Sequence, residues 1–194
     1  EVNLNKHQLK VIQKINKNSN KNKIFLLDGV TGSGKTEVYI DIIKKEISRN
    51  KQCLILLPEI ALTNQLLRKF EQRSGIIPWV WNSEMSFKDR RECWHEILNG
   101  KAKVVIGARS ALFLPFKNLS CIIVDEEHDS SYKQDEGVIY NARDMAVVRG
   151  QHSKALVILS SATPSLESIN NVKLGKYIKL DLPKRYGTSL IPSI

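Results

Sequence analysis

The fold class follows chiefly from one continuous segment, Ile24-Phe-Leu-Leu-Asp28-Gly29-Val-Thr-Gly-Ser-Gly-Lys35-Thr36. Its first five residues form a short apolar run, which predicts a buried β-strand. The residues after Thr36 have a helical pattern. The eight residues from Gly29 to Thr36 match G-x-x-x-x-G-K-[ST], in the strand–loop–helix context that this motif requires. The sequence therefore predicts a phosphate-binding loop.

The residue types of this loop follow from what phosphate groups need. Glycines let the backbone curl so that its N–H groups point inward, and the start of a helix adds the positive end of its dipole. We expect Lys35 to reach the β- and γ-phosphates and the Thr36 hydroxyl to bind Mg²⁺. The predicted ATP-binding residues of the loop are Gly29, Val30, Thr31, Gly32, Ser33, Gly34, Lys35 and Thr36.

A second candidate element follows the apolar run at residues 121–124, which ends in Asp125-Glu126-Glu127-His128. Taken alone, this stretch is equally consistent with a solvated acidic turn. With a phosphate loop upstream, we expect Asp125 to hold Mg²⁺ and Glu126 to orient and deprotonate the attacking water. If the stretch is instead a solvated acidic turn, we expect the Glu127 side chain to be exposed to solvent. His128 is either a surface histidine or a sensor of the nucleotide.

Strands and helices are predicted to alternate along the chain. Alternation of this kind indicates an α/β fold with a mostly parallel sheet between two layers of helices, and its ligand is expected at the carboxyl ends of the strands. An alternating pattern predicts an edge strand at Tyr177–Leu182. Buried strands are predicted at 24–28, 53–57, 76–81, 104–106, 121–124 and 156–159, and helices at 34–49, 63–73, 86–100 and near Asn141 and Pro164.

Composition limits the remaining possibilities. The 194 residues are enough for one domain, and 30 basic against 20 acidic residues give a net charge of +10, which favours a polyanionic partner. No apolar run approaches the roughly 18 residues of a spanning helix, so we expect no membrane partner. Cys53, Cys93 and Cys121 form no C-x-x-C pair, which favours buried reduced thiols in a cytoplasmic protein. The chain opens at Glu1 without Met, so we expect residues 1–194 to be one lobe of a longer protein.

Two motifs resemble a known family. Asp125-Glu126-Glu127-His128 after a phosphate loop resembles motif II of superfamily 2 helicases, and Ser160-Ser161-Ala162-Thr163-Pro164 resembles their motif III. Within that superfamily the chain is similar to the bacterial replication-restart helicases over residues 4–192. The stretches that carry this closer resemblance are 29–39, 57–63, 107–113, 125–134 and Ala142-Arg143-Asp144.

The resemblance implies a RecA-like first motor lobe of an ATP-dependent 3′→5′ DNA helicase that acts in replication restart and primosome assembly. It implies ATP and Mg²⁺ as cofactors, Lys35 and Glu126 as catalytic residues, and zinc only in parts of the family protein outside this segment. Forked and single-stranded DNA, single-stranded-DNA-binding protein and other primosome proteins are the implied partners. Coupling of ATP to DNA is implied for His128, Ser161, Ala162 and Thr163.

Several assignments stay open at this point. By resemblance Gln8 reads adenine, but Asn5 and Gln8 are also spaced like a helix-capping pair. Thr63 is either a DNA phosphate contact or a helix cap. Arg109 and Ser110 are expected in a loop that touches the DNA backbone, with an ordinary surface ion pair as the alternative.

The chain departs from the usual family pattern at Ala108, Ser160, Ile139 and Asn141, where Thr, Gly, Arg and His are common. The helically spaced residues Lys6, Lys10, Lys14, Lys17 and Lys21 are best interpreted as a solvated face.

Two rival functions are another phosphate-loop enzyme, such as a small-molecule kinase, and a non-catalytic, nucleotide-responsive binding module. DNA-stimulated ATP hydrolysis would separate the helicase from both.

Overall fold

The structure is a computed structural model that describes residues 4–18 and 24–183. Lys21, the last member of the lysine series, lies outside the described residues. Within the described part, no helix is long and apolar enough to cross a membrane.

A seven-stranded sheet forms the centre of the molecule, with strand order β3-β4-β2-β5-β8-β1-β9. Every neighbouring pair in it is parallel. The predicted edge strand is confirmed as β9, with alternating burial along its length. The strands are β1 (Ile24–Gly29), β2 (Gln52–Leu56), β3 (Trp79–Trp81), β4 (Val104–Gly107), β5 (Leu119–Val124), β8 (Leu156–Ser161) and β9 (Tyr177–Leu182).

One predicted strand is shorter than expected. The apolar run at 76–81 becomes a strand only at Trp79–Trp81, on the opposite edge of the sheet from β9. Pro78 has no N–H group with which to extend the ladder, so the prediction was wrong for the first half of the run.

The helices are α1 (Lys6–Asn18), α2 (Lys35–Ser48), α3 (Asn64–Ser74), α4 (Phe87–Leu98), α5 (Ala142–Ser153) and α6 (Leu166–Lys173). Side-chain caps begin five of them, because the hydroxyl or amide oxygen of Asn5, Thr63, Ser86, Asn141 or Ser165 accepts a bond from an N–H group of the first turn. Short 3-10 turns occupy η2 (Glu59–Ala61), η3 (Arg109–Phe113) and η4 (Ser130–Tyr132).

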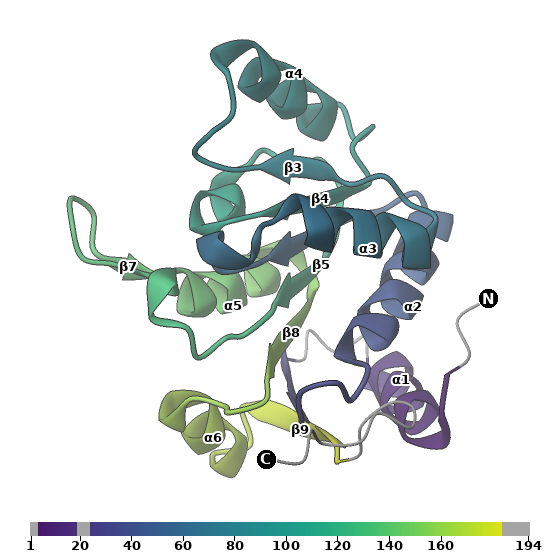
Figure 1. Ribbon diagram of the computed structural model, residues 1–194. Coiled ribbons are helices and arrows are strands. Elements are labelled where there is room, and N and C mark those ends of the chain that lie inside the picture. Colours follow the sequence, from purple (N-terminus) through teal and green to yellow (C-terminus); the bar gives the residue numbers. More distant parts are fainter. Residues whose placement is uncertain (1–3, 19–23, 184–194) are drawn as a thin grey trace, which may run out of the picture.

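A small antiparallel hairpin was not predicted from the sequence. Its strands β6 (Lys133–Gln134) and β7 (Tyr140–Asn141) are only two residues long, too short for a periodicity to be recognised. Figure 1 shows the hairpin projecting from the body of the molecule, close to the start of α5.

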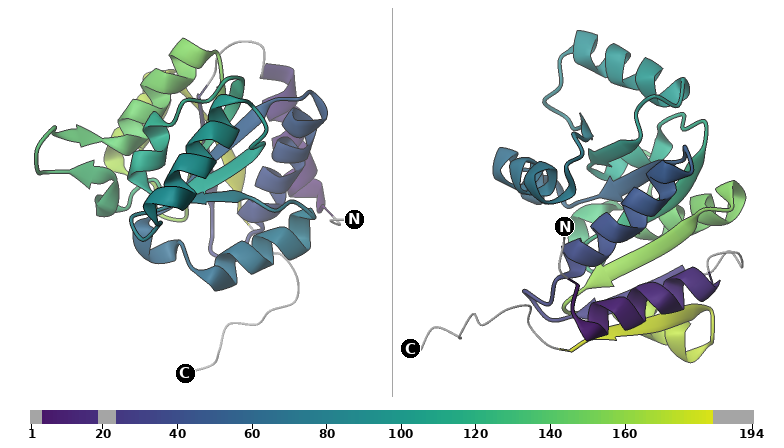
Figure 2. Two further views of the ribbon diagram at one scale, coloured as in Figure 1. Left: turned by 90° about the horizontal axis from the view of Figure 1, so that it is seen from above. Right: turned by 90° about the vertical axis from the view of Figure 1, so that its right-hand side faces the viewer.

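Two hydrophobic cores lie on the two faces of the sheet, which confirms the predicted three-layer α/β architecture. One core joins the sheet to α1, α2 and α3, through residues such as Ile15, Ile43 and Phe70. The other joins it to α4, α5 and η3, through Ile97, Ala146 and Leu112. Figures 1 and 2 show α1 and α2 on one side of the sheet and α5 on the other. All three cysteines are free and buried.

Candidate nucleotide-binding and hydrolysis site

The loop after β1 has the backbone of a phosphate cradle. Gly32 and Gly34 have φ angles of 78° and 83°, in the left-handed region that favours glycine. Gly34 starts α2 without any side-chain cap, so the first N–H groups of that helix remain for a ligand. The Ser33 hydroxyl oxygen is buried and has no hydrogen-bond partner among the described residues. An orphaned polar atom and an uncapped helix start fit the phosphates of a nucleotide.

Lys35 points into this loop. Its Nζ donates to the carbonyl oxygen of Gly29 at 3.0 Å and lies 3.7 Å from Oε1 of Glu126. The lysine side chain is largely buried, so its charge acts with little solvent screening. The structure thus brings the predicted phosphate-binding cation beside the predicted catalytic carboxylate.

Asp125 ends β5 next to the loop, where Thr36 and Asp125 line the same cavity. The Tyr39 hydroxyl donates to Oδ1 of Asp125 at 2.9 Å, and the Ser160 hydroxyl lies in close contact with the same Tyr39 oxygen. Burial raises the pKa of Asp125, although the bond from Tyr39 lowers it. Burial also raises the pKa of Tyr39 well above its usual value, so Tyr39 remains a donor. Two oxygen groups near a phosphate loop are the donor set that Mg²⁺ prefers.

Glu126 is held in an uncommon backbone conformation. Its φ of 47° lies in the left-handed region, which non-glycine residues seldom adopt outside special sites. Its side chain is about 40% exposed, and Oε2 lies 3.6 Å from Nδ1 of His128. The same His128 nitrogen is 2.7 Å from the Ser161 hydroxyl, which also accepts from the N–H of Thr163. A continuous set of contacts therefore links Glu126 to the turn at residues 161–163, where Ala162 is partly buried.

Glu127 is not solvated, so the interpretation of this residue as a surface carboxylate was wrong. It is 1% exposed, and its carboxylate accepts bonds from Ser165 N (2.7 Å), Ser165 Oγ (2.9 Å) and Ser168 Oγ (2.9 Å). Arg143 Nη1 lies 3.5 Å away. Burial lowers the pKa of Arg143, but the bond and charge of Asp144 and the charges of Glu127 and Glu167 raise it overall. Glu127 thereby ties the turn after β5 to the starts of α5 and α6.

Gln8 forms a helix-capping pair with Asn5, which was one of the two roles predicted for it. Asn5 Oδ1 accepts from the N–H groups of His7 and Gln8, and Gln8 Oε1 accepts from Asn5 N at 2.7 Å. The other end of the Gln8 amide donates to the carbonyl oxygen of Gly34 at 3.1 Å. The side chain is fully buried. It joins α1 to the phosphate loop, and adenine reading by Gln8 stays a prediction.

The residues predicted to touch DNA follow β2 and β4, which are neighbours in the sheet. Thr63 caps α3, because its hydroxyl oxygen accepts a hydrogen bond from the N–H group of Leu66. A helix cap was one of the two roles predicted for this residue. Arg109 Nη1 donates to the carbonyl oxygens of Ser131 (3.2 Å) and Lys133 (2.7 Å). Arg109 and Ser110 also line a groove of about 360 Å³ with residues of the β6–β7 region. Ser110 Oγ accepts from Trp81 Nε1.

Sequence reasoning missed two tyrosines of the site. Tyr39 contacts Asp125, and its position four residues after Lys35 places it on the same face of α2, a spacing that could have revealed it. Tyr132 is buried, and its hydroxyl lies 2.6 Å from the carbonyl oxygen of Asp125 and 3.0 Å from that of Leu56. Tyr140 packs edge-on against Phe113.

Comparison with known proteins gives this geometry a context. The chain is 52% identical to the replication restart protein PriA of Rickettsia conorii over 89% of its length, which is 27% of that protein. It is 50% identical to PriA of Haemophilus influenzae over 86% of the chain and 23% of that protein, and 43% identical to PriA of Bacillus subtilis over 91% and 22%. The chain therefore spans about a quarter of the length of these relatives.

Solved structures share the fold at lower sequence identity. RecG bound to a three-way DNA junction has a TM-score of 0.67 with 20% identity, over 96% of this chain and 24% of that one. The DUF1998 helicase MrfA bound to DNA and AMPPNP has a TM-score of 0.63 with 22% identity, over 92% and 27%. Residues 5–172 match the family model described as DEAD/DEAH box helicase. The chain belongs to the DEAD/DEAH box helicase family.

Proposed function

We propose that residues 1–194 form a single ATP-binding motor lobe of a 3′→5′ DNA helicase that acts in replication restart and primosome assembly. The observation that carries the proposal is the convergence of Lys35, Asp125 and Glu126 on one phosphate loop, in a chain similar to PriA proteins. Forked and single-stranded DNA, single-stranded-DNA-binding protein and other primosome proteins are the proposed partners, in the cytoplasm. Zinc is proposed only for parts of the protein beyond this chain.

The chain's own residues divide the work of hydrolysis. Lys35 would bind the β- and γ-phosphates, and Thr36 with Asp125 would hold Mg²⁺, which neutralises developing charge when bound. Glu126 would orient and deprotonate the attacking water. An arginine from a second lobe would be needed to stabilise the transition state, as in related motors.

The contacts around His128 suggest how the site communicates. His128 lies between the Glu126 carboxylate and the Ser161 hydroxyl. A change in the position of Glu126 on hydrolysis would therefore alter the turn that contains Ala162 and Thr163. This route supports the coupling role proposed for these residues.

ATP turnover by the full-length protein, with and without forked DNA, tests the proposed function. We expect DNA to stimulate hydrolysis and strand separation to require ATP. The 194-residue chain alone should hydrolyse ATP very slowly, because a missing arginine finger costs about 10³–10⁵ in rate. Brisk, DNA-independent turnover by the chain alone would contradict the two-lobe mechanism.

Lys35→Ala should weaken binding of ADP and ATP to the chain in the presence of Mg²⁺. Removal of a charge-assisted contact is expected to cost about 1.5–3 kcal/mol. Titration calorimetry would measure this loss. Lys44→Ala is the matched control, because Lys44 is an exposed lysine of the same helix. Equal losses for the two variants, or no nucleotide binding by the folded wild-type chain, would contradict the assignment.

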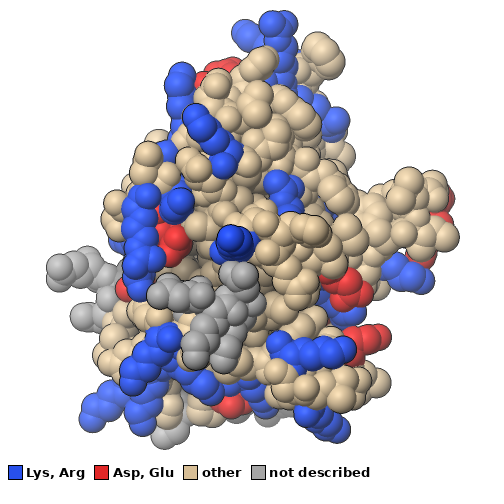
Figure 3. Space-filling view, turned by 180° about the vertical axis from the view of Figure 1, so that it is seen from behind, with Lys and Arg blue, Asp and Glu red and all other residues tan. Residues whose placement is uncertain are grey.

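Arg109→Ala should weaken binding of single-stranded DNA more than Lys10→Ala does. Basic side chains are spread over the face seen from behind rather than gathered over one element (Figure 3), so general attraction acts in both variants. Arg109 differs because it lines the groove beside β6 and β7. If it contacts one phosphate, its loss should flatten the slope of log K against log salt by about 0.7.

Fluorescence anisotropy over a salt series would measure these affinities and slopes. Circular dichroism of both variants would show whether they remain folded, which matters because Arg109 also bonds two backbone carbonyls. Equal losses and equal slopes would remove Arg109 from the DNA-binding surface.

A further inference from the structure

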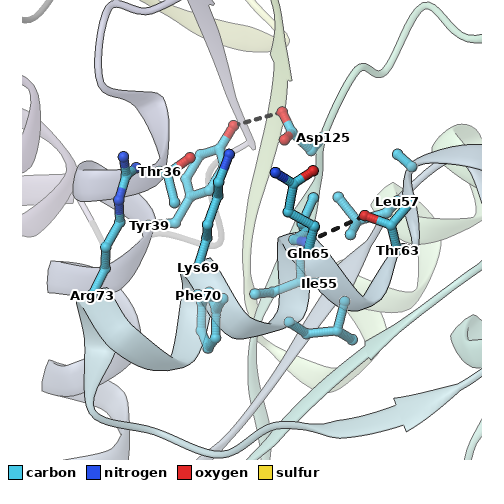
Figure 4. Close-up of a pocket in the computed structure, with 13 residues that line it drawn as sticks. Thr36, Tyr39, Ile55, Leu57, Thr63, Gln65, Lys69, Phe70, Arg73 and Asp125 are labelled. Carbon is cyan, nitrogen blue, oxygen red and sulfur yellow. Dashed lines mark hydrogen bonds between the residues drawn. The ribbon is translucent and has the colours of Figure 1, made fainter.

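Tyr39 is a buried side chain that joins the two halves of the proposed magnesium site. It follows Thr36 by three residues, so both lie on the same face of α2. Its hydroxyl donates to Oδ1 of Asp125 at 2.9 Å. Figure 4 shows this bond at the wall of the cavity that Thr36, Tyr39 and Asp125 line together. One helix therefore carries a proposed magnesium ligand and the side chain that holds the other ligand.

The two carboxylate oxygens of Asp125 have different environments. Oδ1 accepts from the Tyr39 hydroxyl and, at 3.1 Å, from the N–H group of Glu126. Oδ2 accepts no hydrogen bond from residues 4–18 and 24–183, and it is not fully enclosed. Two donors on one oxygen restrict rotation of the carboxylate and leave the other oxygen for a ligand. Carboxylate oxygens are ligands that Mg²⁺ prefers, so a magnesium ion would meet one oxygen of Asp125 in a defined orientation.

Ser160 supports the tyrosine from the sheet. It is fully buried on β8, where it comes directly after Leu159, the partner of Val124 in β5. This register places Ser160 beside Asp125, and its hydroxyl contacts the Tyr39 oxygen. A serine hydroxyl can donate to the phenol oxygen while the phenol donates to the carboxylate. Ser160 thereby keeps the Tyr39 hydroxyl directed at Asp125.

We propose that Tyr39 is a positioning residue for Asp125 and gives the site its preference for Mg²⁺ over Ca²⁺. This inference rests on the proposed function, in which Asp125 holds Mg²⁺. Mg²⁺ demands near-ideal octahedral geometry, whereas Ca²⁺ accepts flexible arrangements that include both oxygens of one carboxylate. With Oδ1 occupied, Asp125 offers a single oxygen, which suits Mg²⁺. Without the Tyr39 hydroxyl the carboxylate would rotate more freely, so Mg²⁺ would lose more affinity than Ca²⁺.

The gain in ADP affinity that a metal ion provides is the quantity to measure. Calorimetry of the chain would give the dissociation constant of ADP in EDTA, in saturating Mg²⁺ and in saturating Ca²⁺, without any need for turnover. Because linkage is reciprocal, the gain that a metal gives to ADP equals the gain that ADP gives to the metal. We expect Tyr39→Phe to keep its ADP affinity in EDTA. Its gain from Mg²⁺ should fall about three- to tenfold, the usual effect of one lost hydrogen bond, and its gain from Ca²⁺ should fall less.

Two further variants separate positioning from general damage. Tyr177→Phe is the matched control, because Tyr177 is another buried tyrosine, paired with Ile24 at the opposite end of the sheet. It should leave both gains unchanged. Ser160→Ala should lower the gain from Mg²⁺ by less than Tyr39→Phe does. The double variant should lose no more than Tyr39→Phe alone, because Ser160 acts through the tyrosine.

Three results would overturn the role of Tyr39: an unchanged gain from Mg²⁺ in a folded Tyr39→Phe variant, equal losses for Mg²⁺ and Ca²⁺, or additive losses in the double variant. If circular dichroism shows that Tyr39→Phe does not fold, an unchanged gain from Mg²⁺ in Ser160→Ala would overturn it instead. A wild-type chain that binds ADP but gains nothing from Mg²⁺ would also refute this role and leave the nucleotide site intact. A folded wild-type chain that does not bind ADP at all would contradict the proposed function, and this inference with it.

Discussion

Glu126→Gln is expected to lower ATP turnover by the full-length protein about 10²–10⁴-fold, the usual contribution of a general base. Glutamine keeps the size of the side chain but cannot accept a proton from water. Lys35, Thr36 and Asp125 stay in place, so ATP binding should persist. The backbone at Glu126, with its φ of 47°, is as accessible to glutamine as to glutamate, so the substitution adds no backbone strain.

Steady-state ATPase rates in saturating DNA, combined with nucleotide titrations, would check this expectation. Glu136→Gln provides the matched control, because Glu136 is an exposed carboxylate in the loop between β6 and β7. Its replacement should leave turnover unchanged. Comparable turnover by the Glu126→Gln protein and the wild type would assign water activation to another group, whereas loss of nucleotide binding would assign Glu126 a structural role.

The parts of this site that the sequence predicted are contiguous along the chain. The phosphate loop needs only eight residues and the backbone geometry of its glycines, so its pattern is visible without knowledge of the fold. Asp125 and Glu126 were also recognised, because each follows directly from the end of a buried strand. The parallel sheet then brings both motifs to the same edge, since β1 and β5 each pair with β8.

The parts that were missed depend on contacts between distant segments. Tyr39 and Asp125 are 86 residues apart, and their bond exists only because α2 crosses the carboxyl end of β5. Ser160, a departure from the usual family glycine, places a hydroxyl against the same tyrosine. No local pattern distinguishes a solvated glutamate from a buried one, so Glu127 was assigned to the surface. Its partners Ser165 and Ser168 lie in a segment whose serines look like ordinary helix-capping residues.

Glu127→Ala is expected to destabilise the chain by about 3–5 kcal/mol, the range observed when one partner of a buried ion pair is removed. The substitution would leave Ser165 N and the Ser168 hydroxyl without the acceptor to which they now donate. It would also take one of the carboxylates away from Arg143, whose side chain is 8% exposed. Arg143 keeps its bond to Asp144 at 2.8 Å, which limits the loss to this range.

Urea denaturation of the chain, followed by circular dichroism, would measure the free energy of unfolding. Glu136→Ala is the control for a carboxylate at an exposed position, where substitutions usually change stability by less than about 0.5 kcal/mol. Glu127→Gln should fall between the two, because its amide oxygen can still accept from Ser165 N while its NH₂ group faces the guanidinium of Arg143. If Glu127→Ala were as harmless as Glu136→Ala, the buried carboxylate would not be what ties the turn after β5 to α5 and α6, and the position of Glu126 would have to be maintained by Tyr132 and the sheet alone.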